Sequence, residues 1–221
     1  MTTRALIFDF DGLLVDTEAA VLLAWQEAFA EHGTEFPLDV WHTVIGTQHT
    51  ATTMFPLLRN HAGGLELEEF RLVLRARIGA LLENEGPRPG VLDYLDAAAD
   101  LGLTLAVASS STGGWVSTHL RQQGLTDRFA AVLTGDLHPA KPRPDLYLAA
   151  LDALGVTAAQ ALAFEDSPHG VSAAKAAGLR CVAVPNAITV ALDLSHADLT
   201  LSSFEDKPLG ELLRHFSGDT A

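Results

Sequence analysis

Two carboxylates stand two residues apart directly after the first apolar run of the chain. Asp9 and Asp11 follow Ala5–Phe8, and the next residue, Gly12, permits a sharp backbone turn. On an extended chain, side chains at positions i and i+2 point to the same side. Such a pair can hold a hard divalent cation through oxygen, or divide the roles of nucleophile and general acid. An Asp-rich turn that caps a strand is the structural alternative.

A run of hydroxyl residues follows a second apolar segment of the chain. Ser109–Gly114 comes directly after Leu103–Ala108. Hydroxyls and backbone N–H groups at a strand-to-helix junction can hold phosphoryl oxygens. The alternative is that these serines only cap a helix.

One lysine lies in a stiffened segment of the chain. Pro142 and Pro144 restrict the backbone around Lys141, and a lysine held in place there could offset the charge of a phosphate. The alternative is an ordinary surface lysine in a proline-rich loop.

Two more acids end a fourth apolar run. Glu165 and Asp166 follow Ala161–Phe164, and a helix is expected to begin at Ser167 or Pro168. Metal coordination is the functional interpretation of these acids. Favourable charge near a helix N-terminus is the structural one.

The elements that must position these residues alternate along the chain. Strands are expected at Ala5–Phe8, Leu103–Ala108, Ala131–Thr134, Ala161–Phe164, Cys181–Val184 and Asp198–Leu201. Helices are expected at Val91–Leu101, Gly114–Gln123, Pro144–Leu154 and Pro168–Ala177. This alternation indicates an α/β fold with a parallel sheet covered on both faces. Because such sheets bind ligands at the carboxyl ends of their strands, the four clusters are expected to converge in one crevice.

The region from Thr17 to about Glu85 breaks this alternation. Its pattern predicts four helices, at Glu18–Glu31, Leu38–Ile45, Gln48–Arg59 and Glu66–Glu83. A stiff boundary of Pro and Gly, Gly86–Gly90, precedes the return of the alternating pattern. We therefore expect an all-helical insert of about 70 residues after the first strand.

Composition limits the classes of partner. The chain of 221 residues carries a net charge of −14, a field that disfavours binding to nucleic acid or to an anionic membrane surface. A small anionic substrate would need local positive charge from a metal ion or a placed cation. The N-terminal apolar run is interrupted by Asp9 and reads neither as a signal peptide nor as a membrane span. The single cysteine, Cys181, is expected in a buried strand, which fits a reducing, cytoplasmic setting.

Four segments together resemble the motifs of the haloacid dehalogenase-like hydrolase superfamily. They are Asp9–Glu18, Ala108–Ser111, Lys141–Asp145 and Phe164–Gly170. The resemblance spans essentially the whole chain and is nearest to the branch of β-phosphoglucomutase and the small sugar-phosphate and phosphoglycolate-type phosphatases. It implies a Rossmann-like parallel sheet core, residues 1–16 and 86–221, with an all-helical cap domain, residues 17–85, inserted after the first strand.

The resemblance also implies roles for single residues. Asp9 would be the nucleophile that forms an aspartyl-phosphate, and Asp11 the general acid and base. Phosphate-binding residues would be Ser109, Ser110 and Lys141. Mg²⁺ would be held by the Asp9 carboxylate, the Asp11 backbone carbonyl, Asp166 and Glu165.

Departures from the patterns of particular branches reduce the number of activities that the resemblance allows. Dehalogenases of the superfamily lack the acid at position 11, and its phosphonate hydrolases need a cap lysine, which residues 17–85 do not contain. β-Phosphoglucomutase carries a cap histidine and a cap arginine where Val21 and Gln48 stand here. Because recognition of a second phosphate normally needs a cation, we expect a phosphatase that acts on a small phosphorylated metabolite. The cap loop is expected to set specificity, through Gly46, Thr47, Gln48 and His49.

Two alternatives stay open at this stage. One is phosphoryl transfer of the β-phosphoglucomutase type. The other is a non-catalytic binding protein on the same scaffold, against which the presence of Asp9, Asp11, Lys141 and Asp166 argues. A monomer is expected, because core and cap can bury one another.

Overall fold

Six short apolar segments form one parallel sheet in the computed structural model, which describes residues 2–44, 50–83 and 85–217. The strands are β1 Ala5–Phe8, β2 Thr104–Ser109, β3 Ala131–Thr134, β4 Ala161–Glu165, β5 Arg180–Ala183 and β6 Leu199–Thr200. Their order across the sheet is β3-β2-β1-β4-β5-β6, and all neighbouring pairs are parallel. The expected parallel α/β sheet is confirmed, and β1 lies in its interior between β2 and β4.

Alternate residues of each strand enter separate hydrophobic layers on the two faces of the sheet. Leu6 and Phe8 of β1 pack into one layer, whereas Ala5 and Ile7 pack into the other. The first layer is covered by α5 Val91–Asp100, α6 Gly113–Gln122 and α9 Leu209–Ser217, the second by α7 Asp145–Leu154 and α8 Pro168–Ala176. Every central strand is therefore buried on both sides, which explains why the strands read as continuous apolar runs.

One helix of the core was not expected from the sequence. α9 follows a short 3₁₀ turn, Phe204–Asp206, and buries Leu209 and Leu212 in the first layer. The other core helices and strands lie within a residue or so of their expected bounds. Such small shifts at the ends of elements are ordinary.

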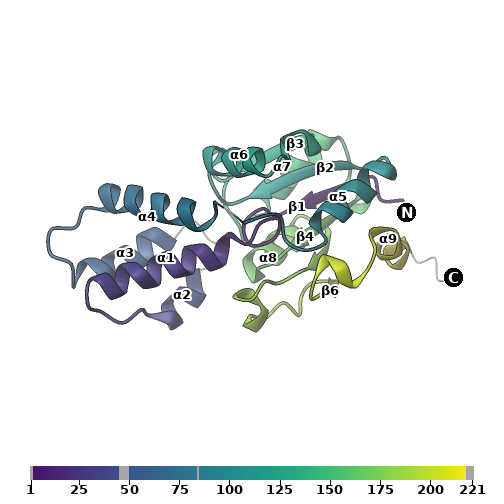
Figure 1. Cartoon of the computed structure of the whole chain (residues 1–221). Helices are drawn as coiled ribbons and strands as arrows, with labels where there is room; N and C mark the ends of the chain where they lie inside the picture. The colour runs from purple at the N-terminus through teal and green to yellow at the C-terminus, as the bar shows by residue number, and fades with distance from the viewer. Residues whose placement is uncertain (1, 45–49, 84, 218–221) are drawn as a thin grey trace.

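Between β1 and α5 the described part of the chain contains four helices that pack mainly on one another. They are α1 Thr17–Glu31, α2 Leu38–Val44, α3 Thr50–Arg59 and α4 Leu67–Leu81, here called the cap helices. They share a separate hydrophobic cluster, in which Trp25 lies 5.1 Å from Phe70 between ring centroids. Trp25 therefore packs within the cap. Figure 1 shows these helices at one end of the molecule, beside the helix-covered sheet.

The two chain segments that connect the sheet to the cap helices are tied to each other. Val15 on the outgoing segment pairs with Pro87 on the returning one, and the Arg88 backbone N–H donates to the Leu14 carbonyl at 2.9 Å. The Arg88 guanidinium donates to the Gly12 carbonyl at 2.6 Å and to carbonyls that follow β5. Entrance and exit of the insert are thus joined close to Asp11.

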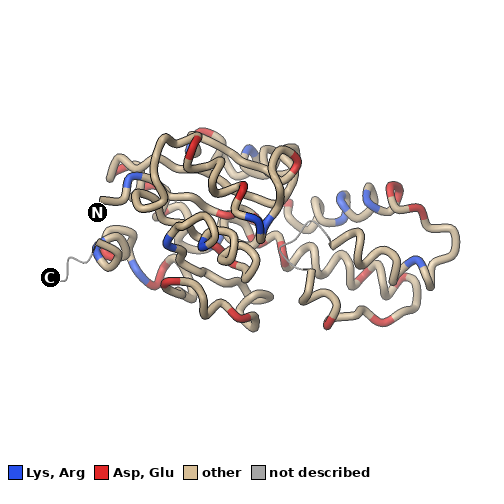
Figure 2. The backbone as a smooth tube through the Cα atoms, turned by 180° about the vertical axis from the view of Figure 1, so that it is seen from behind, with Lys and Arg blue, Asp and Glu red and all other residues tan. Residues whose placement is uncertain are grey.

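Acidic residues are distributed over the whole of the described chain (Figure 2). Figure 2 shows Asp and Glu positions spread over both the sheet part and the cap helices. Within the residues that the structure describes, we find no helix with both the length and the apolar character that crossing a bilayer requires. Cys181 is a buried free thiol in β5.

Candidate active site

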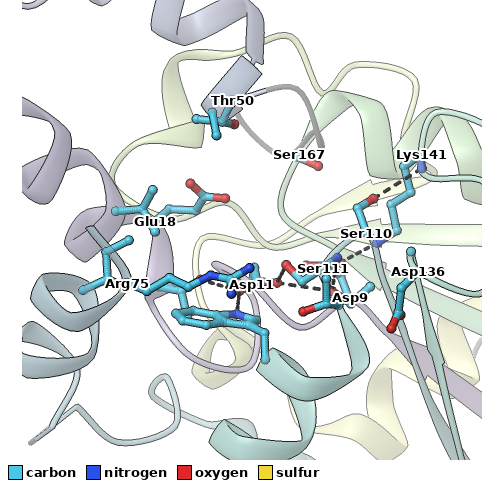
Figure 3. Close-up of a pocket in the computed structure, with 18 of the residues that line it drawn as sticks. Asp9, Asp11, Glu18, Thr50, Arg75, Ser110, Ser111, Asp136, Lys141 and Ser167 are labelled. Carbon is cyan, nitrogen blue, oxygen red and sulfur yellow. Dashed lines mark hydrogen bonds and ion pairs between the residues drawn. The ribbon is translucent and has the colours of Figure 1, made fainter. Parts of the chain in front are cut away.

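The residues that follow β1, β2 and β4 meet at one end of the sheet and line a cavity of about 530 Å³. The sheet side of this cavity carries Asp9, Asp11, Ser109, Lys141 and Asp166. The cap helices line the opposite side. Figure 3 shows Asp9, Asp11 and Lys141 on the sheet side of this space, with Glu18 and Arg75 on the cap side. The convergence of the four clusters is therefore as expected from the strand ends.

Asp9 is a buried carboxylate held by a buried lysine. The residue is only 6% exposed, and Oδ1 accepts a hydrogen bond from Lys141 Nζ. Burial raises the pKa of Asp9 to about 8; Lys141 opposes this shift, and the charges of Glu165 and Asp11 add to it. The pKa of Lys141 is raised too, because attraction to Asp9 and Glu165 outweighs the effect of burial. Lys141 therefore stays cationic.

Glu165 is fixed from three directions behind Asp9. Oε1 accepts hydrogen bonds from Lys141 Nζ and from the Tyr147 hydroxyl, both at 2.5 Å, and Oε2 accepts from the Asp166 backbone N–H at 3.3 Å. The first turn of α8 makes room for it, since a Cβ on Gly170 would lie 1.9 Å from Oε2. Glycine at position 170 is required for this carboxylate to occupy its place.

Three carboxylates lie close enough together that they could hold a divalent cation. One oxygen from each of Asp9, Glu165 and Asp166 lies within 4.8 Å of the others. Burial, and then repulsion from Asp9 and Glu165, raises the pKa of Asp166 well above its ordinary range. Oxygen ligands of this kind suit Mg²⁺, and a bound cation would relieve that repulsion. Asn186, after β5, orients Asp166 through a hydrogen bond of 2.8 Å to Oδ2.

The carboxylate of Asp11 points away from this metal cluster and accepts four hydrogen bonds. Oδ1 accepts from Thr17 Oγ1 at 3.0 Å and from Trp115 Nε1 at 2.7 Å. Oδ2 accepts from Ser109 Oγ at 3.2 Å and from Ser111 Oγ at 2.7 Å. Only the backbone carbonyl of Asp11 is left as a candidate metal ligand, and that part stays a prediction.

The other expected phosphate-binding residues lie around the same point. Ser109 accepts a hydrogen bond from the Ser111 backbone N–H at 3.0 Å, and Ser110 accepts one from the Lys141 backbone N–H at 3.3 Å. Ser109, Ser110 and Lys141 all line the cavity. The structure thus brings them together beside Asp9.

The cap side of the cavity combines apolar side chains, such as Leu74 and Ile78, with acidic and cationic ones. Glu18 of α1 is buried against it, and burial together with the charges of Asp11, Asp9 and Asp16 raises the pKa of Glu18 to about 8. Arg71 and Arg75 of α4 line the same space, and Arg75 extends toward Asp11 (Figure 3). Val21 lies there as well. The expected specificity residues Gly46, Thr47, Gln48 and His49 fall outside the described residues.

Comparison with known proteins agrees with this geometry. The family model described as "Haloacid dehalogenase-like hydrolase" matches residues 6–184. The chain belongs to this family. It is 47% identical over 216 residues to "Putative phosphatase YhcW" of Bacillus subtilis (strain 168), covering 97% of this chain and 98% of that protein.

Solved structures of this family share the fold over most of the chain. One is CbbY from Rhodobacter sphaeroides, solved in complex with phosphate and, as a mutant, with Xylulose-(1,5)bisphosphate. Both structures are 29% identical to this chain with a TM-score of 0.78, and the match covers 93% of this chain and 96% of theirs. A "putative beta-phosphoglucomutase" from Thermotoga maritima is 26% identical with a TM-score of 0.76, covering 99% of this chain and 100% of that one. These comparisons confirm the expected family and fold. They also confirm that the chain is a phosphoric monoester hydrolase.

Several residues of this family site were missed by reasoning from the sequence. Asn186 could have been found, because it follows β5 and the strand-end rule applies there as well. Ser111 belongs to the serine run already noted, whereas Trp115, Thr17 and Tyr147 carry no local signal of their roles. The cap histidines His42 and His61 are exposed and so lie away from the site. Arg143 pairs with Asp145 at 3.0 Å on the surface.

Proposed function

We propose that this hydrolase removes the phosphoryl group from a small phosphorylated metabolite with the help of Mg²⁺, through an aspartyl-phosphate on Asp9. One observation carries the proposal. The Asp9 carboxylate lies beside Lys141 and within 4.8 Å of oxygens of Glu165 and Asp166, at the edge of a cavity of about 530 Å³. A nucleophile, a lysine and a metal-ligating pair are what phosphoryl transfer requires, since it depends on positioning and on neutralising charge.

The reaction would proceed in two steps on this chain's own residues. An oxygen of Asp9 attacks phosphorus while the bond to the leaving oxygen breaks, and that oxygen takes a proton from Asp11. Water then attacks the phosphorus, gives a proton to Asp11, and Asp9 is released as a carboxylate with inorganic phosphate as product. Mg²⁺ at Asp9, Glu165 and Asp166 would supply charge to offset repulsion between the carboxylate and the phosphate dianion.

Lys141, Ser109 and Ser110 are proposed to hold the phosphoryl oxygens. Lys141 faces Asp9 and is only 4% exposed. Its charge acts in a site from which most water is excluded, so its attraction to a phosphoryl group is weakly screened. The serine hydroxyls, which bond to Asp11 and to the Lys141 backbone, can rotate toward a bound phosphate.

Three charged side chains in the lining of the cavity support a polar leaving group such as a sugar. Glu18 can accept hydrogen bonds from hydroxyl groups, and Arg71 and Arg75 can bind oxygens or a further anionic group. An apolar leaving group would leave Glu18 without a partner inside the site, which is unfavourable. We therefore propose a sugar phosphate or a similar polyol phosphate as substrate.

The two parts of the chain are proposed to divide this work. Residues 1–16 and 86–221 would form the catalytic unit, and residues 17–85 a cap domain that selects the leaving group. The separate hydrophobic cluster of the cap helices supports this division. The specificity role of residues 46–49 stays a prediction.

A panel of phosphorylated metabolites, scored by kcat/KM with and without Mg²⁺, tests the proposal. We expect Mg²⁺-dependent release of phosphate, with sugar phosphates ahead of aryl phosphates. Folded protein with metal present that turns over no ester between pH 5 and 9 would contradict it. An enzyme that strongly prefers an apolar ester would contradict the assignment of the substrate class alone.

Phosphoryl transfer within a sugar is a second candidate, favoured by one specific observation. Position 48 lacks a cation, but Arg71 and Arg75 line the cavity from α4 and could bind a second phosphate. The alternatives separate on β-glucose 1-phosphate: a phosphatase yields free glucose and phosphate, whereas a mutase yields glucose 6-phosphate. We expect free glucose, since Val21 stands at the position of the mutase's cap histidine.

A further inference from the structure

Trp115, in the first turn of α6, makes a contact with the site that the mechanism above does not use. Its indole Nε1 donates a hydrogen bond of 2.7 Å to Asp11 Oδ1. An indole N–H can only donate, so this bond requires Oδ1 to act as an acceptor. A hydroxyl in the same place could reverse its role, whereas Trp115 cannot.

The second donor on Oδ1 is the hydroxyl of Thr17. Thr17 Oγ1 accepts from the Gly12 backbone N–H at 3.1 Å and donates to Asp11 Oδ1 at 3.0 Å. The Gly12 N–H occupies one of the two acceptor sites of this hydroxyl and leaves its hydrogen available for Asp11. Both lone pairs of Oδ1 are thereby occupied by donors.

The other oxygen of Asp11 has partners of a different kind. Oδ2 accepts from Ser109 Oγ and Ser111 Oγ, and both hydroxyls can rotate. Ser109 is also a proposed phosphate ligand, so its bond to Oδ2 is expected to be exchanged when a phosphate binds. The two oxygens of one carboxylate thus differ: Oδ1 has a partner, the Trp115 indole, that can only donate, whereas both partners of Oδ2 are hydroxyls that can exchange.

The indole itself is held firmly. The ring of His119, one turn later on α6, lies 4.0 Å from the indole centroid, and the Trp115 carbonyl is 2.9 Å from His119 Nδ1. Trp115 also packs against the hydrophobic cluster of the sheet core and against that of the cap helices. A donor supported on so many sides can fix the carboxylate that it contacts.

We propose that Trp115 is a positioning residue for the acid–base steps: with Thr17 it binds Asp11 Oδ1 and so leaves Oδ2 as the oxygen that exchanges the proton. Oδ2–H gives its proton to the leaving oxygen as the bond from phosphorus to that oxygen breaks and the bond from Asp9 to phosphorus forms. In the second step Oδ2 takes a proton from the attacking water. The inference rests on the proposed function.

The dependence of rate on the leaving group tests this role. Trp115→Phe removes the N–H and keeps an aromatic ring. The test compares kcat/KM for phenyl, 4-nitrophenyl and 2,4-dinitrophenyl phosphate, which are similar in shape but differ in how much the leaving oxygen needs a proton. Since kcat/KM ends at the first irreversible step, it reports transfer to Asp9 and not the later hydrolysis.

We expect the loss in Trp115→Phe to grow as the leaving group becomes more basic. It should be within about 3-fold for the dinitrophenyl ester and about 10- to 100-fold for the phenyl ester, part of the 10²- to 10⁴-fold that general acid catalysis contributes. Ratios between esters on one preparation do not depend on the fraction of folded protein. Trp41→Phe is the matched control, because Trp41 is buried among the cap helices and Nε1 has no partner within the described residues.

The outcomes separate this inference from the function on which it rests. Equal losses on all three esters, or none, in Trp115→Phe would overturn the positioning role of Trp115 and leave the phosphatase intact. Wild-type protein that hydrolyses no phosphate ester would overturn the proposed function. In an Asp11→Asn background, Trp115→Phe should add no further leaving-group effect, and an added effect would contradict a role that acts through Asp11.

Discussion

The side of the cavity that the sheet provides is buried and densely hydrogen-bonded, whereas the side that the cap helices provide contains exposed, long side chains. On the sheet side, Asp9, Glu165 and Lys141 are at most 6% exposed and bond to one another. On the cap side, Arg75 is exposed and extends into the space from α4. Fixed groups suit a reaction whose geometry is the same for every ester, and adaptable groups suit recognition of a variable leaving group. Four experiments test this difference between the two sides of the cavity.

The sharpest test of the sheet side is Asp9→Asn. The amide cannot attack phosphorus, so kcat should fall by about 10⁴-fold or more on every ester, with an unchanged circular dichroism spectrum. Burst and steady-state release of nitrophenol measure this loss. Near-native turnover would rule out Asp9 as the nucleophile.

Removal of the metal should affect the sheet side and not the cap. Chelation should lower turnover by more than about 10²-fold, because a bound cation is worth several kcal/mol of charge stabilisation, and added Mg²⁺ should restore it. Saturating Mg²⁺ should also raise the free energy of unfolding, by about 2.7 kcal/mol at 100 times Kd. This shift should vanish in Asp166→Asn and persist in Arg75→Gln; a shift that survives Asp166→Asn would contradict the proposed ligand set.

Two glycines give the same comparison in terms of stability. Gly170→Ala would place a Cβ 1.9 Å from Glu165 Oε2, so overpacking should cost about 2–3 kcal/mol and activity should fall with it. Gly79→Ala in α4 meets no atom within 4 Å and should stabilise the chain by about 0.5–1 kcal/mol. Denaturant unfolding measures both. A neutral Gly170→Ala would mean that Glu165 is not held as tightly as its contacts indicate.

The smallest expected effect concerns specificity on the cap side. Arg75→Gln should lower kcat/KM about 10-fold for a sugar bisphosphate relative to the monophosphate that lacks only the second phosphate, as expected for one lost ion pair. Arg59→Gln is the control, since Arg59 of α3 does not line the cavity. Equal losses on both sugars would instead place Arg75 near the transferred phosphate and break the division between the two sides.

The sequence was most informative about the sheet side and least about the cap side. Asp9, Glu165 and Lys141 could be predicted because parallel strands end at one edge, so residues far apart in sequence must meet there. Asn186 obeys the same rule at β5. Arg71 and Arg75 could not be found this way, because which side of a helix faces a cavity depends on how the helices pack, and α4 carries arginines on more than one side. Trp115 could not be predicted for a similar reason, because its role depends on a contact with Asp11, 104 positions away in the sequence.

The tied segments at the base of the cap have a consequence for how such a protein can change. Val15, Pro87 and Arg88 join the two ends of the insert. The insert can therefore be treated as a single loop whose two ends are held together at the sheet. The entropy of closing a loop grows only slowly with its length. An insert of another length or another fold could therefore be grafted at this junction at little cost to the sheet. With the division of work proposed above, such a graft would replace the substrate range as a unit and leave Asp9 and Asp11 unaltered.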